Sequence, residues 1–210
     1  MLDPTEILSR RRTRPGPPGW ITTYTGRRFN ALAPDPESIC YQDFAYGLSH
    51  KFRYGGQSDP AMTVAEHSVL VSQIVKRLWP EAHLMRAGLL HDVAEGYTVD
   101  IPSPVRKHTF VMPPGEGSLL QWNELEGRIL NLVGLMYGLP LGVFDTPEVR
   151  AADMLALCIE YRDMTNLKGP DYGLPDVPEE IESLRAAFYD PATARRYFIA
   201  YGAELGLWQP

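Results

Sequence analysis

The sequence predicts an all-α fold. In several segments apolar residues recur at steps of three and four, which is the period of a helix with one buried face, and prolines separate these segments. Hydrophobic residues make up 44% of the 210 positions and charged residues 22%, so the chain can bury a core and global disorder is disfavoured. This length suits one domain. We expect residues 21–210 to form it and residues 1–20 to be a flexible N-terminal arm.

The arm carries a basic run, RRRTRPGPP, over Arg10–Pro18. Such a run could contact nucleic acid or an acidic partner, but its prolines and glycine favour a mobile arm. Tyr24–Gly26 then opens a short extended segment, which we expect to be a small hairpin that ends near Pro34. Prolines at Pro34–Pro36 break the chain before a predicted helix over about Ile39–His50.

Two helices are predicted in the middle of the chain. The first spans Thr63–Leu78, where apolar side chains recur at helical spacing. Thr63 is a suitable N-cap, and Glu66, three residues later, completes a capping box. Pro80 ends this helix, and the second helix is expected over Glu81–Glu95.

Four more helices are predicted in the second half of the chain. Pro147 stands at the first-turn position of one of them, where the missing N–H costs nothing. Loops are expected at Pro102–Pro104 and Pro113–Gly117, because prolines and glycines gather there. The expected helices span Leu119–Met136, Pro147–Asn166, Glu179–Phe188 and Pro191–Leu205.

Four polar residues interrupt the apolar faces of these helices. His67 shares its face with the valines three positions before and four positions after it. The pair His91-Asp92 follows a small apolar run at the end of its helix, and Asp153 stands among apolar residues of a later helix. A lone histidine on an apolar face is usually a core residue. A buried aspartate, however, must be paired, hydrogen-bonded or bound to metal, because burying a bare carboxylate costs several kcal/mol.

Two imidazoles and two carboxylates on three helices are better explained together than apart. We expect His67, His91, Asp92 and Asp153 to hold one divalent metal ion. Mixed nitrogen and oxygen ligation suits Mn, Co, Zn, Mg, Ni or Fe rather than a soft metal. An octahedral ion with four protein ligands keeps open positions for water and a phosphate oxygen. It could polarise the phosphorus centre and lower the pKa of the attacking water.

The order His…His-Asp…Asp on successive helices resembles the signature of the HD-domain phosphohydrolases. Here it is AEHSVLVS over 65–72, LHDVAE over 90–95 and AADML over 151–155. The stretch HDVAEGYTVDIPSPVR over 91–106 is similar to that of the HD-type 5'-deoxynucleotidases. It also resembles small phage and prophage deoxynucleotide phosphohydrolases, including phage dATP triphosphohydrolases. The resemblance covers roughly two-thirds of the chain and implies an HD-domain helical bundle, with the short hairpin at its N-terminal end.

The resemblance also implies roles for residues around the metal ligands. Glu95 and Asp100 match the two acids that follow the His-Asp pair, and we expect them to be catalytic, acting on the attacking water and on the leaving group. Arg53 is expected to bind substrate, because a guanidinium offers forked donors to phosphate oxygens. Gln57, where the family pattern has a histidine, and Lys107 complete the expected substrate contacts. Gln57 could keep a hydrogen bond but not a charge.

Other polar residues are expected to contribute less. His50, Lys51 and Arg106 are weaker candidates for phosphate contacts and are more typical of a solvated surface. The acid-base run Glu160, Arg162 and Asp163 predicts an ion network that is structural or supports the site, with the structural role favoured.

The predicted function is metal-dependent deoxynucleotide phosphohydrolysis. A metal-activated water would remove the 5'-phosphate or the triphosphate of a purine deoxynucleotide such as dAMP or dATP. Another HD hydrolase is an alternative, but alarmone hydrolases carry Glu-Asp after the His-Asp pair, whereas here Gly96 follows Glu95. Cyclic-dinucleotide phosphodiesterases carry a lysine at the Glu95 position and a Gly-Tyr-Pro signature, and this sequence has neither. A non-catalytic nucleotide-binding HD module is the third hypothesis.

Charge and cysteine content limit the partners. The net charge is −6, which disfavours stable binding of duplex nucleic acid but permits a small anionic deoxynucleotide. The two cysteines, Cys40 and Cys158, form no CxxC pair and fit a reducing compartment. No apolar run is long enough to span a bilayer. We therefore expect no membrane association and a cytoplasmic location in a bacterium or a phage-infected host. The resemblance to HD-domain proteins, which often pair through exposed helices, implies a homo-oligomer.

Overall fold

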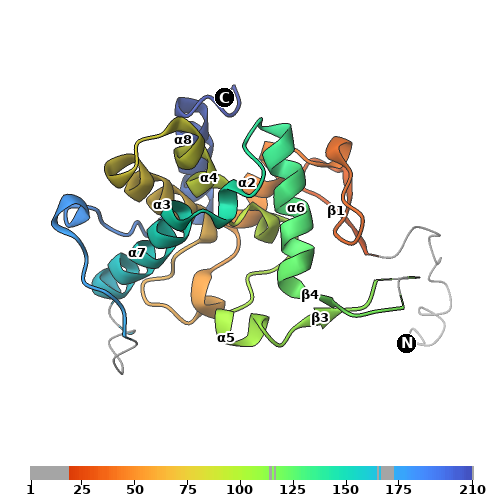
Figure 1. The fold of residues 1–210 in the computed structure, drawn as a ribbon, viewed down its shortest axis with the longest axis horizontal. Helices are drawn as coiled ribbons and strands as arrows, with labels where there is room; N and C mark the ends of the chain where they lie inside the picture. The colour runs from red at the N-terminus through yellow and green to blue at the C-terminus, as the bar shows by residue number, and fades with distance from the viewer. Residues whose placement is uncertain (1–18, 114, 116, 165, 167–172, 210) are drawn as a thin grey trace, which may run out of the picture.

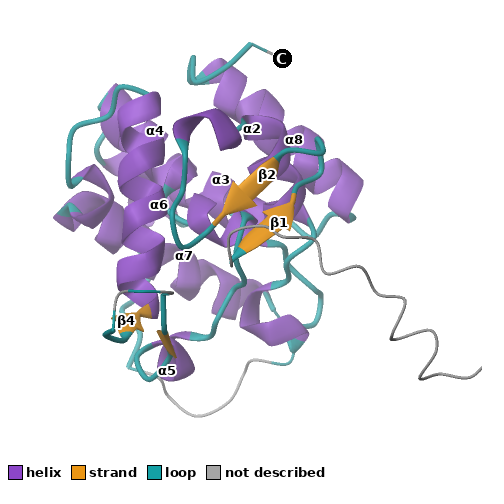
Figure 2. Cartoon of the chain, turned by 90° about the vertical axis from the view of Figure 1, so that its right-hand side faces the viewer, coloured by secondary structure: helices purple, strands orange, loops and turns teal. Residues whose placement is uncertain are grey.

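The computed structural model describes residues 19–113, 115, 117–164, 166 and 173–209. These residues form a mostly helical fold with two short antiparallel hairpins, so the all-α prediction is confirmed (Figure 1, Figure 2). The predicted arm, with its basic run, lies outside the described residues as far as residue 18, and the first strand already begins at Trp20.

The hairpins and helices follow one another along the whole described chain. In chain order the elements are β1 (Trp20–Thr22), β2 (Arg28–Asn30), the 3-10 helix η1 (Pro36–Ser38), α2 (Tyr41–Ser49), η2 (Arg53–Gly56), α3 (Val64–Leu78), α4 (Ala82–Leu90), η3 (Val93–Gly96), α5 (Ser103–Arg106), β3 (Phe110–Val111), β4 (Leu120–Gln121), α6 (Trp122–Met136), η4 (Val143–Asp145), α7 (Pro147–Asp163), η5 (Glu179–Ile181) and α8 (Pro191–Glu204).

Helix α3 is the centre of the fold. Eleven of its 15 residues are buried, and it packs against α2, α4, α7 and α8. The predicted capping box forms at its start, where the Glu66 carboxylate accepts the Thr63 N–H at 2.8 Å and Thr63 Oγ1 accepts the Glu66 N–H at 3.3 Å. One hydrophobic cluster joins these helices and runs from Phe29 to Tyr201. Polar side chains on α3 therefore stand on a rigid support.

The predicted helix Glu81–Glu95 is interrupted, so that prediction was wrong for its last five residues, 91–95. Helix α4 ends at Leu90, and the chain passes through His91 and Asp92 before η3 begins. Asp92 has φ −104° and ψ 14°, outside the α-helical range. Adjacent residues on a continuous helix point about 100° apart. The interruption therefore allows His91 and Asp92 to face the same centre.

The predicted helix Glu179–Phe188 was also wrong. Only the 3-10 helix η5 forms, because tertiary contacts take up the backbone groups that a helix would pair. The Arg162 guanidinium donates to the carbonyls of Glu182 and Leu184, and the Asp163 carboxylate accepts the Ala186 N–H at 2.9 Å. Helical periodicity in the sequence does not report such contacts.

The remaining helices agree with the sequence to within three residues at each end. The N-terminal hairpin is present, but Tyr24–Gly26 lie in its turn rather than in a strand. The expected loop at Pro102–Pro104 contains the start of the short helix α5. The second hairpin, β3–β4, was not predicted, and it extends from the lower end of α6 in Figure 1. Its expected loop, Pro113–Gly117, lies partly outside the described residues.

Helix α2 approaches η3 backbone to backbone. A Cβ added at Gly47 would lie 1.9 Å from the Gly96 carbonyl oxygen, which is far inside van der Waals contact. The same carbonyl accepts a hydrogen bond from Lys51 Nζ at 3.1 Å. Gly47 therefore sets how closely α2 can hold the segment that follows Asp92.

We expect Gly47→Ala to destabilise the protein by about 1–3 kcal/mol, because backbone must shift to admit one methyl group. Helix propensity alone would favour alanine by about 1 kcal/mol, so the sign of the change in the free energy of unfolding separates the two effects. Thermal unfolding measures it. Gly127→Ala on α6 is the matched control, since a Cβ there meets nothing within 4 Å and should raise the melting temperature. A raised melting temperature for Gly47→Ala would contradict the close approach.

Within the described part of the chain, no helix combines the length and the apolar character needed to cross a membrane.

Candidate metal centre and active site

Two imidazoles meet at the end of α4. His67 projects from α3, with its side chain fully buried, and its Nε2 lies 3.3 Å from His91 Nε2. Each ring is held through its other nitrogen. His91 Nδ1 bonds the Gly88 carbonyl at 2.8 Å, and His67 Nδ1 bonds the Glu160 carboxylate at 2.6 Å. Both partners are acceptors, so both Nδ1 atoms carry the proton and both Nε2 lone pairs face the shared space.

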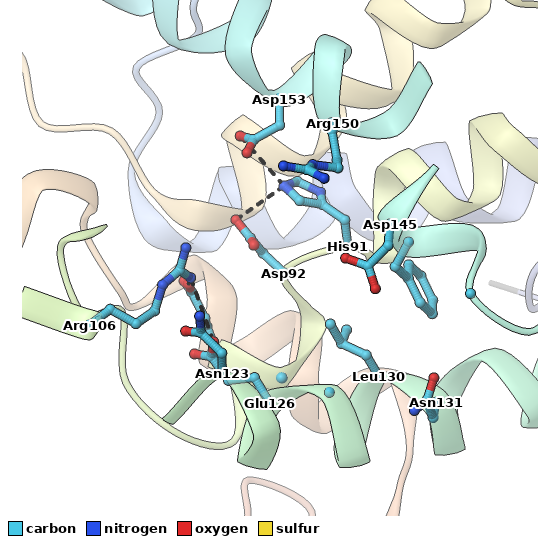
Figure 3. A pocket seen from close by; sticks show the side chains of 15 residues that line it. His91, Asp92, Arg106, Asn123, Glu126, Leu130, Asn131, Asp145, Arg150 and Asp153 are labelled. Atoms are coloured by element: carbon cyan, nitrogen blue, oxygen red, sulfur yellow. Dashed lines mark ion pairs between the residues drawn. The ribbon is translucent and has the colours of Figure 1, made fainter. Parts of the chain in front are cut away.

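Two aspartates close this space. Asp92 Oδ2 is 3.2 Å from His91 Nε2 and 3.6 Å from His67 Nε2. Asp153 Oδ1, from α7, is 3.1 Å from His67 Nε2 and 3.9 Å from His91 Nε2. Figure 3 shows both carboxylates directed at the same nitrogen of His91. Ligand atoms of His67, His91 and Asp153 all lie within 4.8 Å of one another, and Asp92 stands beside this group of three.

The donor set fits a divalent cation. Two imidazole Nε2 atoms and two carboxylate oxygens converge on one small volume, and a divalent cation bound there would be stabilised by all four. Nitrogen and oxygen donors of this kind suit Mn, Fe, Co, Ni, Zn or Mg. The hydrogen bonds that fix both Nδ1 atoms are the outer contacts expected around metal-binding histidines. The structure thus brings together all four residues that the sequence predicted as ligands.

The charges of the centre are strongly coupled. Burial raises the pKa of Asp92, but the neighbouring imidazoles and Arg53 lower it more, to well below its usual range. For Asp153, burial and the Asp92 charge raise the pKa, but the His67 and His91 imidazoles lower it more, to about 2. Burial and Arg53 lower the pKa of His67, whereas Glu160 and Asp153 raise it, and the net value is about 9. The carboxylates are therefore ionised, and protons compete with a metal ion for the imidazoles.

Glu160 connects the metal centre to η2. Its fully buried carboxylate accepts hydrogen bonds from His67 Nδ1, from Arg53 Nε at 2.9 Å and from the Tyr54 hydroxyl at 2.5 Å. Tyr54 has φ 58°, a left-handed conformation that is strained for a tyrosine, so these bonds hold a strained turn in place. The sequence predicted one ion network of Glu160, Arg162 and Asp163, with a structural role favoured. In the structure Glu160 instead supports the His67 imidazole, and Arg162 pairs with Asp163 at 2.7 Å.

Glu95 lies beside the centre on η3, with 5% of its side chain exposed. Its Oε2 is buried and has no hydrogen-bond partner among the described residues, and its Oε1 lies 3.8 Å from Arg106 Nη1. Burial, and then the carboxylates of Asp92, Asp100 and Glu126, raise the pKa of Glu95 well above its usual range. An unpaired buried carboxylate oxygen next to a metal centre is poised to receive a proton.

The HD-domain family model matches residues 64–133 of the chain. An uncharacterized protein of Rhodobacter capsulatus is 31% identical over 192 residues, which are 86% of this chain and 92% of that protein. This chain belongs to the HD-domain family. The uncharacterized protein YfdR of Escherichia coli K12 is 32% identical to this HD-domain protein over 145 residues, 69% of this chain and 72% of YfdR. Membership suggests a metal-dependent phosphohydrolase.

The other predicted site residues of this HD domain differ in their positions. Asp100 is half-buried, and burial raises its pKa above the usual range. Arg53 lowers this pKa and Asp92 raises it, so Asp100 lies within electrostatic reach of the centre. Gln57 and Lys107 are exposed, and no side-chain contact joins either of them to the metal centre among the described residues. Arg53 lies closer, with its Nη1 4.0 Å from Asp92 Oδ2.

A cavity of about 290 Å³ opens beside the candidate metal ligands of the HD domain (Figure 3). Sequence reasoning missed several of its polar lining residues. Arg150 is the clearest, and its signal was available: it stands three residues before Asp153 and so shares that face of α7. The missed polar residues on α6 carried no such signal, because polar positions on a helix are usually solvated. These are Asn123, Glu126 and Asn131.

We expect Glu160→Gln to weaken metal binding about 10–100-fold, because an amide cannot hold the His67 imidazole as the carboxylate does. Titration of the protein with Mn or Co measures the affinity. Tyr54→Phe is the matched control, since it removes a bond to the same carboxylate without touching His67. Wild-type metal affinity in Glu160→Gln would show that this carboxylate does not position the ligand.

Proposed function

We propose that this HD-domain protein is a metal-dependent deoxynucleotide phosphohydrolase. It cleaves the 5'-phosphate or the triphosphate of a purine deoxynucleotide such as dAMP or dATP. The observation that carries the proposal is the unpaired oxygen of Glu95, buried beside the four candidate ligands on the wall of the cavity. A site for a substrate, a site for a cation and a free buried base occur there together.

The reaction needs a water molecule, a proton acceptor and help for the leaving oxygen. A divalent ion held by His67, His91, Asp92 and Asp153 would supply positive charge to the phosphate and acidify the water. Glu95 accepts the proton of the attacking water as the new P–O bond forms. The bond between phosphorus and the leaving oxygen then breaks, and that oxygen takes up a proton. Asp100 either donates this proton or orients the group that donates it.

Cations of the chain balance the phosphate charge. Arg53 lies between Glu160 and Asp92, with 15% of its side chain exposed, and keeps its guanidinium at the edge of the centre. Arg106 lies 3.5 Å from Glu126 and 3.8 Å from Glu95. A planar guanidinium donates to two phosphate oxygens at once, which suits both positions. Gln57 and Lys107 remain proposed contacts for the part of a substrate that extends beyond the first phosphate.

The test is a panel of deoxynucleoside monophosphates, ribonucleoside monophosphates and deoxynucleoside triphosphates with Mn, Co, Mg and Zn. Chromatography separates released nucleoside, phosphate and tripolyphosphate. We expect deoxynucleotides to be hydrolysed only with a divalent ion, and the products to decide between monophosphate and triphosphate. Cleavage of an alarmone or a cyclic dinucleotide in place of deoxynucleotides would overturn the proposal. Nucleotide binding without turnover in the metal-loaded protein would show a binding module instead.

A further inference from the structure

The cavity beside the metal centre has two ends of different chemistry. One end is formed by the candidate ligands His91, Asp92 and Asp153. The other lies between α6 and the segment 142–145, which includes Phe144. Its volume of about 290 Å³ is at the lower end of the range for small-molecule sites, ~300–1,000 Å³. It suits one small molecule whose reacting group lies at the ligands.

Gly127 lies in the interior of α6 on the wall of this cavity. Glycine in a helix interior costs about 1 kcal/mol relative to alanine. Packing among the described residues does not require glycine here, since a Cβ at this position would meet none of their atoms within 4 Å. The open space that glycine leaves therefore belongs to the cavity, and a larger side chain would occupy it.

The wall around Gly127 offers polar and apolar contacts. Asn123 and Asn131 stand four residues before and four after it, so all three share one face of α6. Their amides both donate and accept hydrogen bonds, as recognition of a sugar or base requires. Leu130 and Phe144 line the same cavity and supply apolar surface for a planar ring.

Two basic residues, Arg106 and Arg150, line the cavity. Arg106 is already engaged with Glu95 and Glu126. Arg150 is exposed, and no ion pair joins it to another residue in the part of the chain that the structure describes. It stands one helical turn before Asp153 on α7, and both residues line this cavity, as His91 does (Figure 3).

We propose that this cavity is the nucleoside subsite, in which Gly127 leaves the room for the nucleoside and Arg150 contacts the phosphate. The proposal rests on the proposed function, because the phosphate must lie at the metal ligands. Beyond the proposed function, the nucleoside is placed on the α6 side of the metal centre, and one residue is assigned to each end of its site. Gly127 is thus a specificity-determining residue, because its missing side chain sets the size of the group admitted.

The two reaction products separate the two ends of the cavity. Calorimetric titrations of the Mn-loaded protein would use deoxyadenosine for one end and inorganic phosphate for the other. We expect Gly127→Leu to weaken deoxyadenosine binding about ten-fold or more and to leave phosphate binding unchanged. Arg150→Ala should do the reverse and weaken phosphate binding about ten-fold. Gly127→Ala should lie between wild type and Gly127→Leu for deoxyadenosine.

Melting temperatures serve as the control for correct folding, and we expect them to be unchanged or raised in both Gly127 variants. Deoxyadenosine binding that is unaffected by Gly127→Leu, or absent in the wild type, would overturn the subsite. A parallel loss of both ligands in each variant would overturn the division into two ends. Failure of the proposed function has a different signature: no nucleotide is hydrolysed by the wild type, although deoxyadenosine still binds and depends on Gly127.

Discussion

Replacement of Asp92 by alanine is expected to remove the metal and the activity together. Its carboxylate lies within 3.6 Å of both imidazole Nε2 atoms, and its pKa is held well below the usual range. Without this charge, the two imidazoles face each other with one carboxylate fewer to attract a cation. Loss of an outer hydrogen bond to a metal ligand typically costs about 10–100-fold in affinity, so loss of a direct ligand should exceed about 100-fold.

Metal content after gel filtration and hydrolysis of the preferred deoxynucleotide measure this effect. Asp145→Ala is the matched control for metal content, because Asp145 is an aspartate of the same cavity without a contact to either imidazole. It should retain the metal. Full metal occupancy in Asp92→Ala would rule out Asp92 as a ligand, and the centre would then consist of the other three residues.

Glu95→Gln is expected to keep the metal and lose turnover. The variant has the same shape, but glutamine cannot accept the proton of the attacking water. General acid–base catalysis contributes about 10²–10⁴-fold, and kcat should fall by that amount with little change in KM. Metal affinity should stay within a few-fold of wild type, because Glu95 is outside the group of ligand atoms.

Stability separates this catalytic role from a structural one. The Glu95 carboxylate is buried near Asp92, Asp100 and Glu126, which raise its pKa, and its Oε2 has no partner among the described residues. Removal of a buried charge from such surroundings should leave the melting temperature unchanged or raise it. A large fall in melting temperature with unchanged kcat would mean that Glu95 holds the fold rather than the proton.

Local sequence signals predicted most of the fold. The capping box at Thr63 and the proline at the first turn of α7 both set helix starts correctly. The break after Leu90 was not predictable, because the apolar pattern continues through Val93 and Ala94, which are buried on η3 instead. The failed helix after Glu179 depends on hydrogen bonds from Arg162, a residue distant in sequence.

The candidate site was predictable where a polar residue interrupts an apolar helix face. The sequence predicted a buried Asp153 that had to pair or bind a metal, but its side chain is 51% exposed, and its 3.1 Å approach to His67 rather than its burial places it at the site. The pair His91-Asp92 was predicted from the same reasoning. Glu160 was harder, because a buried acid two turns after Asp153 gives no hint that it will reach His67 on α3. Gly127 could not be predicted as a site residue, because a lone glycine in a helix indicates a binding role only once the cavity beside it is known.

The most direct test of the central claim is X-ray absorption at the cobalt edge of the Co-loaded protein. The geometry of His67, His91, Asp92 and Asp153 predicts one ion per chain, with two imidazole nitrogens and carboxylate oxygens in its coordination shell. His67→Ala should reduce the imidazole signal by half or abolish binding. A fully loaded protein whose cobalt shows no imidazole scattering, or whose spectrum is unchanged in His67→Ala, would contradict the metal centre described here.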